Sequence, residues 1–166
     1  MESEFSKYQL CPLSESYAAE ISQWEYDPPY AEYSFKGYPD DWLMDRSTWG
    51  TEQFCLVNGD NVVAQVACQF EGDDLWVGWS LSPNLCGKGS GAQFVSLCVM
   101  YLTELKKPTG RILLRVAARN KRAIKAYQKA GFNYLKTIQD EIAYTNHMED
   151  FWVMVWTPTK GNLERQ

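Results

Sequence analysis

The stretch that most constrains this chain is SPNLCGKGSGAQF, residues 82–94, where Gly87, Gly89 and Gly91 occupy every second position. A glycine costs about 1 kcal/mol relative to alanine inside a helix, so three so close together need a physical reason. The run precedes residues 91–106, whose apolar residues recur with helical spacing. Bare backbone N–H groups at a helix start favour an anion. The stretch therefore predicts a phosphate-binding loop, with a plain glycine turn as the alternative.

The remaining patterns predict one α+β domain over residues 1–166, with a loose tail at about residues 158–166. A helix is expected over 14–24 behind a Ser14 cap, and a second over 120–131 between an Asn120 cap and Gly131. Hairpin turns are expected at Asn58-Gly59 and Gly72-Asp73. The expected strands are three within residues 52–83, followed by 111–117, 132–138 and 151–157. The sheet should be mixed and mostly antiparallel, with helices flanking it.

The helix predicted over residues 91–106 is apolar on more than one face, as expected of a helix buried against a sheet. One face carries Phe94, Leu97, Cys98, Tyr101, Leu102 and Leu105, and a second carries Val95 and Val99.

Charge is distributed unevenly along the chain. Residues 1–75 carry fifteen Asp and Glu against three Lys and Arg, a net charge of −12, whereas residues 76–166 carry six against thirteen, a net of +7. The asymmetry indicates one surface for a cation and another for an anion, unless surface charge merely drifts along the chain. The overall charge of −5 argues against nucleic acid as a partner.

Other bulk features narrow the class of protein further. The N-terminal residues lack a signal-peptide pattern and no segment is apolar enough to span a membrane, so a cytoplasmic location is expected. Five cysteines without a CxxC pair, and a single histidine, argue against a disulfide framework and a zinc site. Cys55, Cys68 and Cys98 are expected to be small core residues, and no metal is predicted.

Two nucleotide-binding motifs fit the glycine run poorly. A Walker loop needs Lys-Ser or Lys-Thr after its last glycine, and here Ala92-Gln93 follows Gly91. The spacing Gly87-x-Gly89-x-x-Ala92 satisfies the loose dinucleotide pattern, but that pattern belongs to a parallel strand–helix–strand unit. The strands before residue 82 are joined by hairpin turns, so they are expected to be antiparallel.

Two segments together resemble the GNAT superfamily of acetyl-CoA-dependent N-acetyltransferases. LSPNLCGKGSGA, residues 81–92, is similar to the family's pyrophosphate loop, R/Q-x-x-G-x-G/A, with Cys86 in place of the usual Arg or Gln. RVAARNKRAIKAYQKAGF, residues 115–132, is similar to its Asn…Ala…Tyr…Gly-Phe helix. The resemblance implies a sheet whose fourth and fifth strands splay to admit acetyl-CoA, and direct acetyl transfer to a primary amine.

The resemblance also implies roles for individual residues. The CoA pyrophosphate would lie on the loop, and the pantetheine arm would pair with the preceding strand; the implied residues are Gly87, Lys88, Gly89, Ser90, Gly91, Ala92, Trp79, Ser80 and Leu81. Asn120 would hydrogen-bond the arm near the thioester. Tyr127 would protonate the departing thiolate, although helical spacing alone also fits a core aromatic.

The general base is left open by the sequence. An amine with a pKa of about 10.4 must lose a proton before it attacks. Many relatives place a glutamate where this chain has Trp76 or Arg115, neither of which is a base. Asp73 and Asp74 fit a hairpin turn better. Glu25, Asp27 and Glu32 are the other candidates, because the family's acceptor side is formed by the first helix and the loop after it.

The same segment, residues 24–49, supplies the expected acceptor site. Aromatic rings and carboxylates suit a cationic amine, although at least half of the rings are expected to pin the loop onto the core. The predicted substrate-binding residues are Trp24, Glu25, Tyr26, Asp27, Tyr30 and Glu32. A polyamine, an amino acid, an aminoglycoside-like antibiotic and a protein amine all remain open as the acceptor, and so does a homodimer. A non-catalytic module that binds CoA or an effector is the alternative function.

Overall fold

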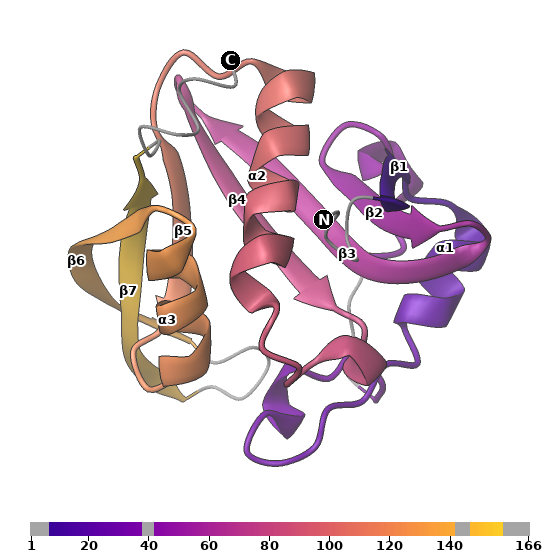
Figure 1. Ribbon diagram of the computed structural model, residues 1–166, viewed down its shortest axis with the longest axis horizontal. Helices are drawn as coiled ribbons and strands as arrows, with labels where there is room; N and C mark the ends of the chain where they lie inside the picture. The colour runs from indigo at the N-terminus through magenta and orange to yellow at the C-terminus, as the bar shows by residue number, and fades with distance from the viewer. Residues whose placement is uncertain (1–6, 38–41, 142–146, 158–166) are drawn as a thin grey trace. The chain divides into compact units, whose positions relative to one another are not determined.

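A computed structural model of the chain describes residues 7–37, 42–141 and 147–157 (Figure 1). The predicted tail at residues 158–166 lies outside the described part. The strands are β1 (Gln9–Pro12), β2 (Gln53–Asn58), β3 (Asn61–Glu71), β4 (Asp74–Leu81), β5 (Ile112–Ala117), β6 (Phe132–Glu141) and β7 (Met148–Trp156). The α-helices are α1 (Glu15–Ile21), α2 (Gly91–Lys106) and α3 (Lys121–Lys129). Short 3-10 helices are η2 (Ala31–Tyr33), η3 (Arg46–Thr48) and η4 (Pro83–Leu85).

The strands form one mixed sheet in the order β1-β2-β3-β4-β5-β7-β6. β1 with β2, β2 with β3 and β5 with β7 pair antiparallel, whereas β4 and β5 pair in parallel. The parallel register joins Leu75 to Ile112 and Trp76 to Leu113, near the start of both strands. Both strands continue past this register, β4 to Leu81 and β5 to Ala117. The predicted α+β class and its mostly antiparallel sheet are confirmed.

The chain folds as two compact units. The first comprises Met1–Cys68, Gly78–Lys88 and Glu141–His147, and the second comprises Gln69–Val77, Gly89–Asp140 and Met148–Gln166. β3 and β4 therefore each contribute residues to both units.

The core of the first unit is built by α1, β1 and β2 together with aromatic residues of the loop after α1. Its buried residues are Leu13, Ala18, Ile21, Trp24, Leu43, Cys55, Val57 and Val62. Helix α1 ends at Ile21, three residues earlier than predicted. The amide of Trp24 donates to the Ile21 carbonyl from a turn, and the indole is buried without being helical. Trp24 was assigned to the helix because its spacing from the other apolar residues is helical, but it is apolar because it is buried in the core.

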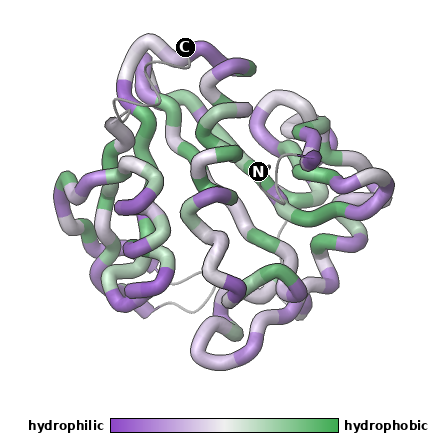
Figure 2. The backbone as a smooth tube through the Cα atoms, viewed as in Figure 1, coloured by the Kyte–Doolittle hydropathy of each residue, from purple (hydrophilic) through white to green (hydrophobic). Residues whose placement is uncertain are grey.

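The core of the second unit lies among α2, α3 and strands β5 and β7. Figure 1 shows α3 against one face of strands β5, β7 and β6. In Figure 2 strand β5 is mainly green, the colour of hydrophobic residues, whereas α3 carries many purple, hydrophilic residues. Helix α2 has the predicted bounds, but its buried residues are Phe94, Val95, Cys98, Val99 and Leu102. Leu105 was predicted on the buried face and is instead 51% exposed, because it lies in the last turn of the helix.

Several strand boundaries differ from the sequence expectation: β6 continues to Glu141, three residues beyond the predicted end, and β7 begins at Met148, three residues before the predicted start. Asn58 pairs with Asn61, so the first hairpin turn is Gly59-Asp60, one residue later than predicted, with Gly59 at φ +64°. Strand β1 was not predicted at all. It has four residues, ends in Pro12 and lies at the edge of the sheet, where proline is tolerated.

Candidate functional site

The glycine run forms an exposed loop that leads into helix α2. Gly87 and Gly89 have φ values of +74° and +77°, a region that other residues rarely adopt. A Cβ at Gly89 would meet nothing within 4 Å, so this glycine is not needed to fit the protein around it. The conformation turns the backbone at both positions and leaves open space beside Gly89.

The start of α2 differs from the starts of the other two α-helices. Ser14 accepts a hydrogen bond from the Tyr17 amide to cap α1, and Asn120 accepts one from the Ala123 amide to cap α3. Ser90 makes no such side-chain bond at the start of α2. The first turn of a helix carries unsatisfied N–H donors and a positive dipole end, so a helix without a side-chain cap can accept an anion there.

Gly91 has a different role from the two glycines before it. Its φ is not positive, and a Cβ at this position would lie 3.2 Å from the Cβ of Ala126 on α3. The glycine therefore lets the first turn of α2 approach α3 closely. This contact brings the predicted pyrophosphate-binding turn beside the helix that carries Asn120 and Tyr127.

Tyr127 lies half-buried on α3. Its ring packs edge-on against Phe132, with ring centroids 6.0 Å apart. The aromatic ring thus has a packing role whatever the hydroxyl does. Asn120 uses its Oδ1 as the helix cap and keeps its amide nitrogen as a further donor group.

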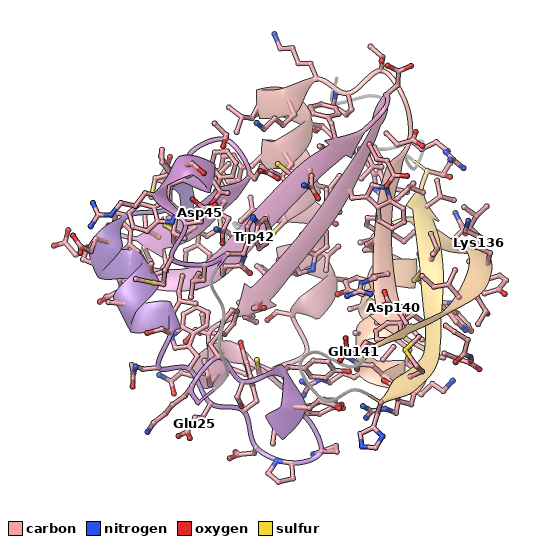
Figure 3. All side chains as sticks on the ribbon, turned by 180° about the vertical axis from the view of Figure 1, so that it is seen from behind. Glu25, Trp42, Asp45, Lys136, Asp140 and Glu141 are labelled. Atoms are coloured by element: carbon pink, nitrogen blue, oxygen red, sulfur yellow. The ribbon has the colours of Figure 1, made fainter. Side chains whose placement is uncertain are left out.

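Arg115, at a position where the resemblance would place a base, contacts residues of neighbouring strands in the sheet. Its guanidinium forms an ion pair with Asp140 near the end of β6 (Figure 3) and lies 5.0 Å from the ring centre of Phe151. Partial burial lowers the pKa of Arg115 from its usual range. The side chain is an electrostatic link between β5 and β6, and it offers no basic lone pair.

Asp74, one of the two neighbouring aspartates considered as a base, is held by residues just before β5. Its carboxylate accepts hydrogen bonds from the backbone amide of Arg111, at 2.7 Å, and from the Arg111 guanidinium, at 2.9 Å. The Gly110 amide donates to the Asp73 carbonyl, at 2.9 Å. The sequence assigned these aspartates to the hairpin turn at residues 72–73, whereas the bonds described here join them to residues 110–111, before β5.

A pH dependence of stability follows from this pair. The side-chain hydrogen bonds from Arg111, and then its amide, hold the pKa of Asp74 below the usual value. A lowered folded-state pKa adds stability above the unfolded pKa of about 3.9, and that stability is lost as the pH falls through the folded pKa. The urea midpoint of Asp74→Asn should therefore fall less than that of the wild type between about pH 5 and pH 3.

Asp73→Asn is the matched control for this measurement, because it keeps both the Asp74 carboxylate and the residue-73 carbonyl. It should follow the wild-type curve. Parallel curves for Asp74→Asn and the wild type would show that the Arg111 contact does not lower the pKa of Asp74 on folding.

In the first unit, the loop after α1 is bonded to the end of β4. The Tyr26 hydroxyl donates to the Leu81 carbonyl at 2.5 Å, and the Cys86 thiol lies 3.7 Å from the same oxygen. Burial, followed by the nearby Cys86, raises the pKa of Tyr26, so the phenol stays protonated. Sequence reasoning missed this bond because 55 residues separate its partners and no local pattern marks it. Tyr26, predicted to bind the amine acceptor, is thus hydrogen-bonded to Leu81, predicted to bind the pantetheine arm of CoA.

The other predicted acceptor residues divide into packing and exposed groups. Trp24 is buried in the core and packs edge-on against Phe35, so it has the packing role that the sequence left open. Tyr30 stacks on Tyr33. Glu25 points outward (Figure 3) and lies 3.8 Å from the Lys36 ammonium, with Asp27 exposed nearby in sequence.

Within residues 7–37, 42–141 and 147–157, no three His, Cys, Asp or Glu side chains are grouped to hold a metal ion. No helix in that part of the chain is long and apolar enough to cross a membrane.

Solved structures share this fold over nearly the whole chain. A spermidine N-acetyltransferase chimera from Vibrio cholerae and hSSAT has a TM-score of 0.73 and 16% identity, covering 91% of this chain and 95% of its own. Vibrio cholerae spermidine N-acetyltransferase with CoA and spermine gives 0.70 and 15%, covering 90% and 95%. A ribosomal-protein-S5-alanine acetyltransferase from Vibrio fischeri gives 0.62 and 19%, covering 94% and 98%. At these identities the likeness shows the fold alone.

A sequence model identifies the family. The model of the acetyltransferase (GNAT) family matches residues 18–132, which include both the glycine loop and helix α3. The resemblance carried by these two segments is therefore confirmed. The chain belongs to the acetyltransferase (GNAT) family, whose members are enzymes that take the acetyl group from acetyl-CoA.

Proposed function

We propose that this enzyme transfers the acetyl group of acetyl-CoA to a primary amine of a small cationic molecule, by direct attack. The observation that carries the proposal is the positive-φ glycine loop in front of an α2 that has no side-chain cap. A pyrophosphate has the charge and the oxygen acceptors that such a helix start lacks. The exposed Lys88 adds a positive charge to the loop.

The residues of the loop suit close approach of a phosphate. Gly87 and Gly89 hold the turn, and the space beside Gly89 is open. Ser90, Gly91 and Ala92 supply the first N–H groups of α2. Trp79, Ser80 and Leu81 at the end of β4 would pair with the amides of the pantetheine arm, as an added strand pairs with a sheet edge.

The chemical step needs few groups from the protein. The neutral amine attacks the thioester carbonyl, the C–S bond breaks, and the thiolate that leaves takes up a proton. Tyr127 is the proposed donor of that proton, and Asn120 would orient the arm. No covalent enzyme intermediate is required, so no cysteine takes part. Glu25, Asp27 or Glu32 would accept the amine proton, directly or through water.

The charge of the acceptor segment supports a cationic substrate. Residues 1–75 carry a net charge of −12, and exposed carboxylates at Glu25 and Asp27 lie in the loop after α1. Ion pairs and aromatic faces together favour ammonium groups. Two of the similar structures are spermidine N-acetyltransferase or a chimera of it, one of them with spermine bound. A polyamine is therefore the first acceptor to test.

A thiol-release assay tests the proposal. Purified enzyme is given acetyl-CoA with polyamines, amino acids, aminoglycosides and peptides that carry a free N-terminus or lysine, and free CoA thiol is measured. Faster release with a polyamine than with a neutral or acidic amine is expected. Turnover of a peptide alone would move the acceptor to a protein amine. CoA binding without turnover of any amine would favour the non-catalytic alternative.

Gly89→Val is expected to weaken CoA binding at least tenfold while the protein stays folded. A Cβ at this position meets no protein atom within 4 Å, and the valine side chain would occupy the space in which the phosphate approaches. Calorimetric titration with CoA measures the affinity, and thermal unfolding checks the fold. Gly72→Val is the matched control, because Gly72 also has a positive φ and open space beside it, in the hairpin between β3 and β4. Wild-type affinity in Gly89→Val would remove the loop from the CoA site.

A further inference from the structure

Two cysteines face each other across strands β1 and β2 of the first unit. Cys11 and Cys55 are direct partners in the antiparallel register, so their side chains point to the same face of the sheet. Their sulfur atoms lie 3.4 Å apart, although 44 residues separate them in the sequence. The thiols are therefore already in contact in the folded protein.

The backbone at this pair suits a disulfide bond. The Leu13 amide donates to the Gln53 carbonyl, which marks residues 13 and 53 as a hydrogen-bonded pair. Such pairs recur every two residues, so Cys11 and Cys55 form one too, with Cα atoms about 5.5 Å apart. Disulfides most often have a Cα separation of about 5.5–6 Å. Closing the bond requires no change of register, but the two Cβ atoms, which are about 5 Å apart in a hydrogen-bonded pair, must approach to the roughly 3.5–4.5 Å of a disulfide.

The two thiols differ in access to solvent. Cys55 is fully buried among the core residues of the first unit, whereas Cys11 is partly exposed and packs against that core. Burial raises the pKa of the Cys55 thiol, and the neighbouring Cys11 adds to this effect. Cys11 is thus the sulfur that an external reagent can reach, and Cys55 is placed to displace that reagent.

We propose that Cys11 and Cys55 are a reversible redox pair that a low-molecular-weight disulfide oxidises to a disulfide bond between β1 and β2. The Cys11 thiolate attacks the reagent, forms a mixed disulfide and releases one thiol. The Cys55 thiol must then lose its proton, a step that its raised pKa slows, before its sulfur attacks Cys11 Sγ and releases the second thiol. Two protein thiols lose two electrons and two protons, and the reagent disulfide gains them. The bond closes a loop that contains α1 and the acceptor segment, residues 24–49.

Glutathione disulfide is the reagent for the test, with the full-length protein equilibrated in buffers of increasing disulfide-to-thiol ratio. Thiols counted in denaturant should fall from five to three, and the intact mass should fall by about 2 Da. Peptide mapping should find Cys11 joined to Cys55, and dithiothreitol should restore all five thiols. The oxidised protein should melt several degrees higher, because the cross-link restricts the unfolded chain.

Two variants sharpen the test. Cys11→Ser should keep all four of its thiols, whereas Cys86→Ser, which removes another partly exposed cysteine, should fall from four to two. Mapping of the wild-type protein decides the matter even if a variant folds poorly. Five thiols retained at every ratio, a stable glutathione adduct on Cys11, or a bond between other cysteines would each overturn the proposal. None of these results depends on acetyl transfer.

Discussion

Tyr127→Phe is expected to lower kcat by roughly 10²–10⁴-fold, with little change in the affinity for CoA. The substitution removes only the phenolic oxygen. The ring that packs edge-on against Phe132 is kept, so α3 and its contact with α2 should be unchanged. If the hydroxyl protonates the departing thiolate, its loss affects only the transition state. Because a thiolate is a good leaving group, the loss should lie toward the lower end of that range.

The measurement is steady-state kinetics with the best amine of the panel, together with CoA titration of both proteins. Tyr134→Phe is the matched control. It removes the same oxygen from an exposed tyrosine on β6, where the hydroxyl contacts Thr137 Oγ1 at 2.8 Å. That variant should keep the wild-type kcat. A Tyr127→Phe enzyme with wild-type kcat would leave Tyr127 with its packing role alone.

Elements with local boundary signals could be predicted from the sequence to within a residue or two. The structure gives helix α2 the predicted bounds, because a glycine loop precedes it and its apolar periodicity covers four turns. Helix α3 lies between the Asn120 cap and Gly131, which adopts φ +108° just after the helix. In both cases the boundary residues act on their own neighbours in the chain.

Several features that the sequence did not predict share the opposite property, since each depends on a distant partner. Strand β1 has four residues, and only its pairing with β2 makes it a strand. The Arg115 ion pair joins β5 to Asp140, and the Tyr26 hydroxyl reaches the Leu81 carbonyl across 55 residues. No pattern within a window of the sequence contains both partners of such a contact. For the same reason the general base could be narrowed to candidates but not chosen.

The three glycines of the loop show how a single motif can combine different physical requirements. Gly87 and Gly89 are needed for their positive φ, whereas Gly91 is needed because a Cβ would crowd Ala126. From the sequence all three were assigned to the approach of a phosphate. Spacing alone does not distinguish a glycine that admits a ligand from one that admits a neighbouring helix.

Gly131→Ala is expected to lower the free energy of unfolding by about 2–4 kcal/mol, a large part of the 5–15 kcal/mol typical of a folded domain. At φ +108° a side chain is strained, and the new Cβ would lie 2.9 Å from the Thr157 carbonyl oxygen and 3.1 Å from the Trp156 indole nitrogen. Two hydrogen bonds join the end of α3 to the end of β7 and the residue after it. The Thr157 amide donates to the Gly131 carbonyl, and the Trp156 indole donates to the Ala130 carbonyl. Relieving the clash therefore displaces hydrogen bonds between the end of α3 and β7.

Urea unfolding at fixed temperature measures this loss, and Gly72→Ala is the control that separates strain from crowding. Gly72 has φ +63° in the hairpin before β4, and a Cβ there meets nothing within 4 Å, so its alanine variant should lose only about 1 kcal/mol. For a chain of this size the two losses correspond to melting temperatures lower by roughly 4–16 °C and 2–4 °C. Equal losses in the two variants would mean that the end of β7 moves aside at no cost. The glycine after α3 would then be required for its backbone angle alone, and not for the close contact with Thr157.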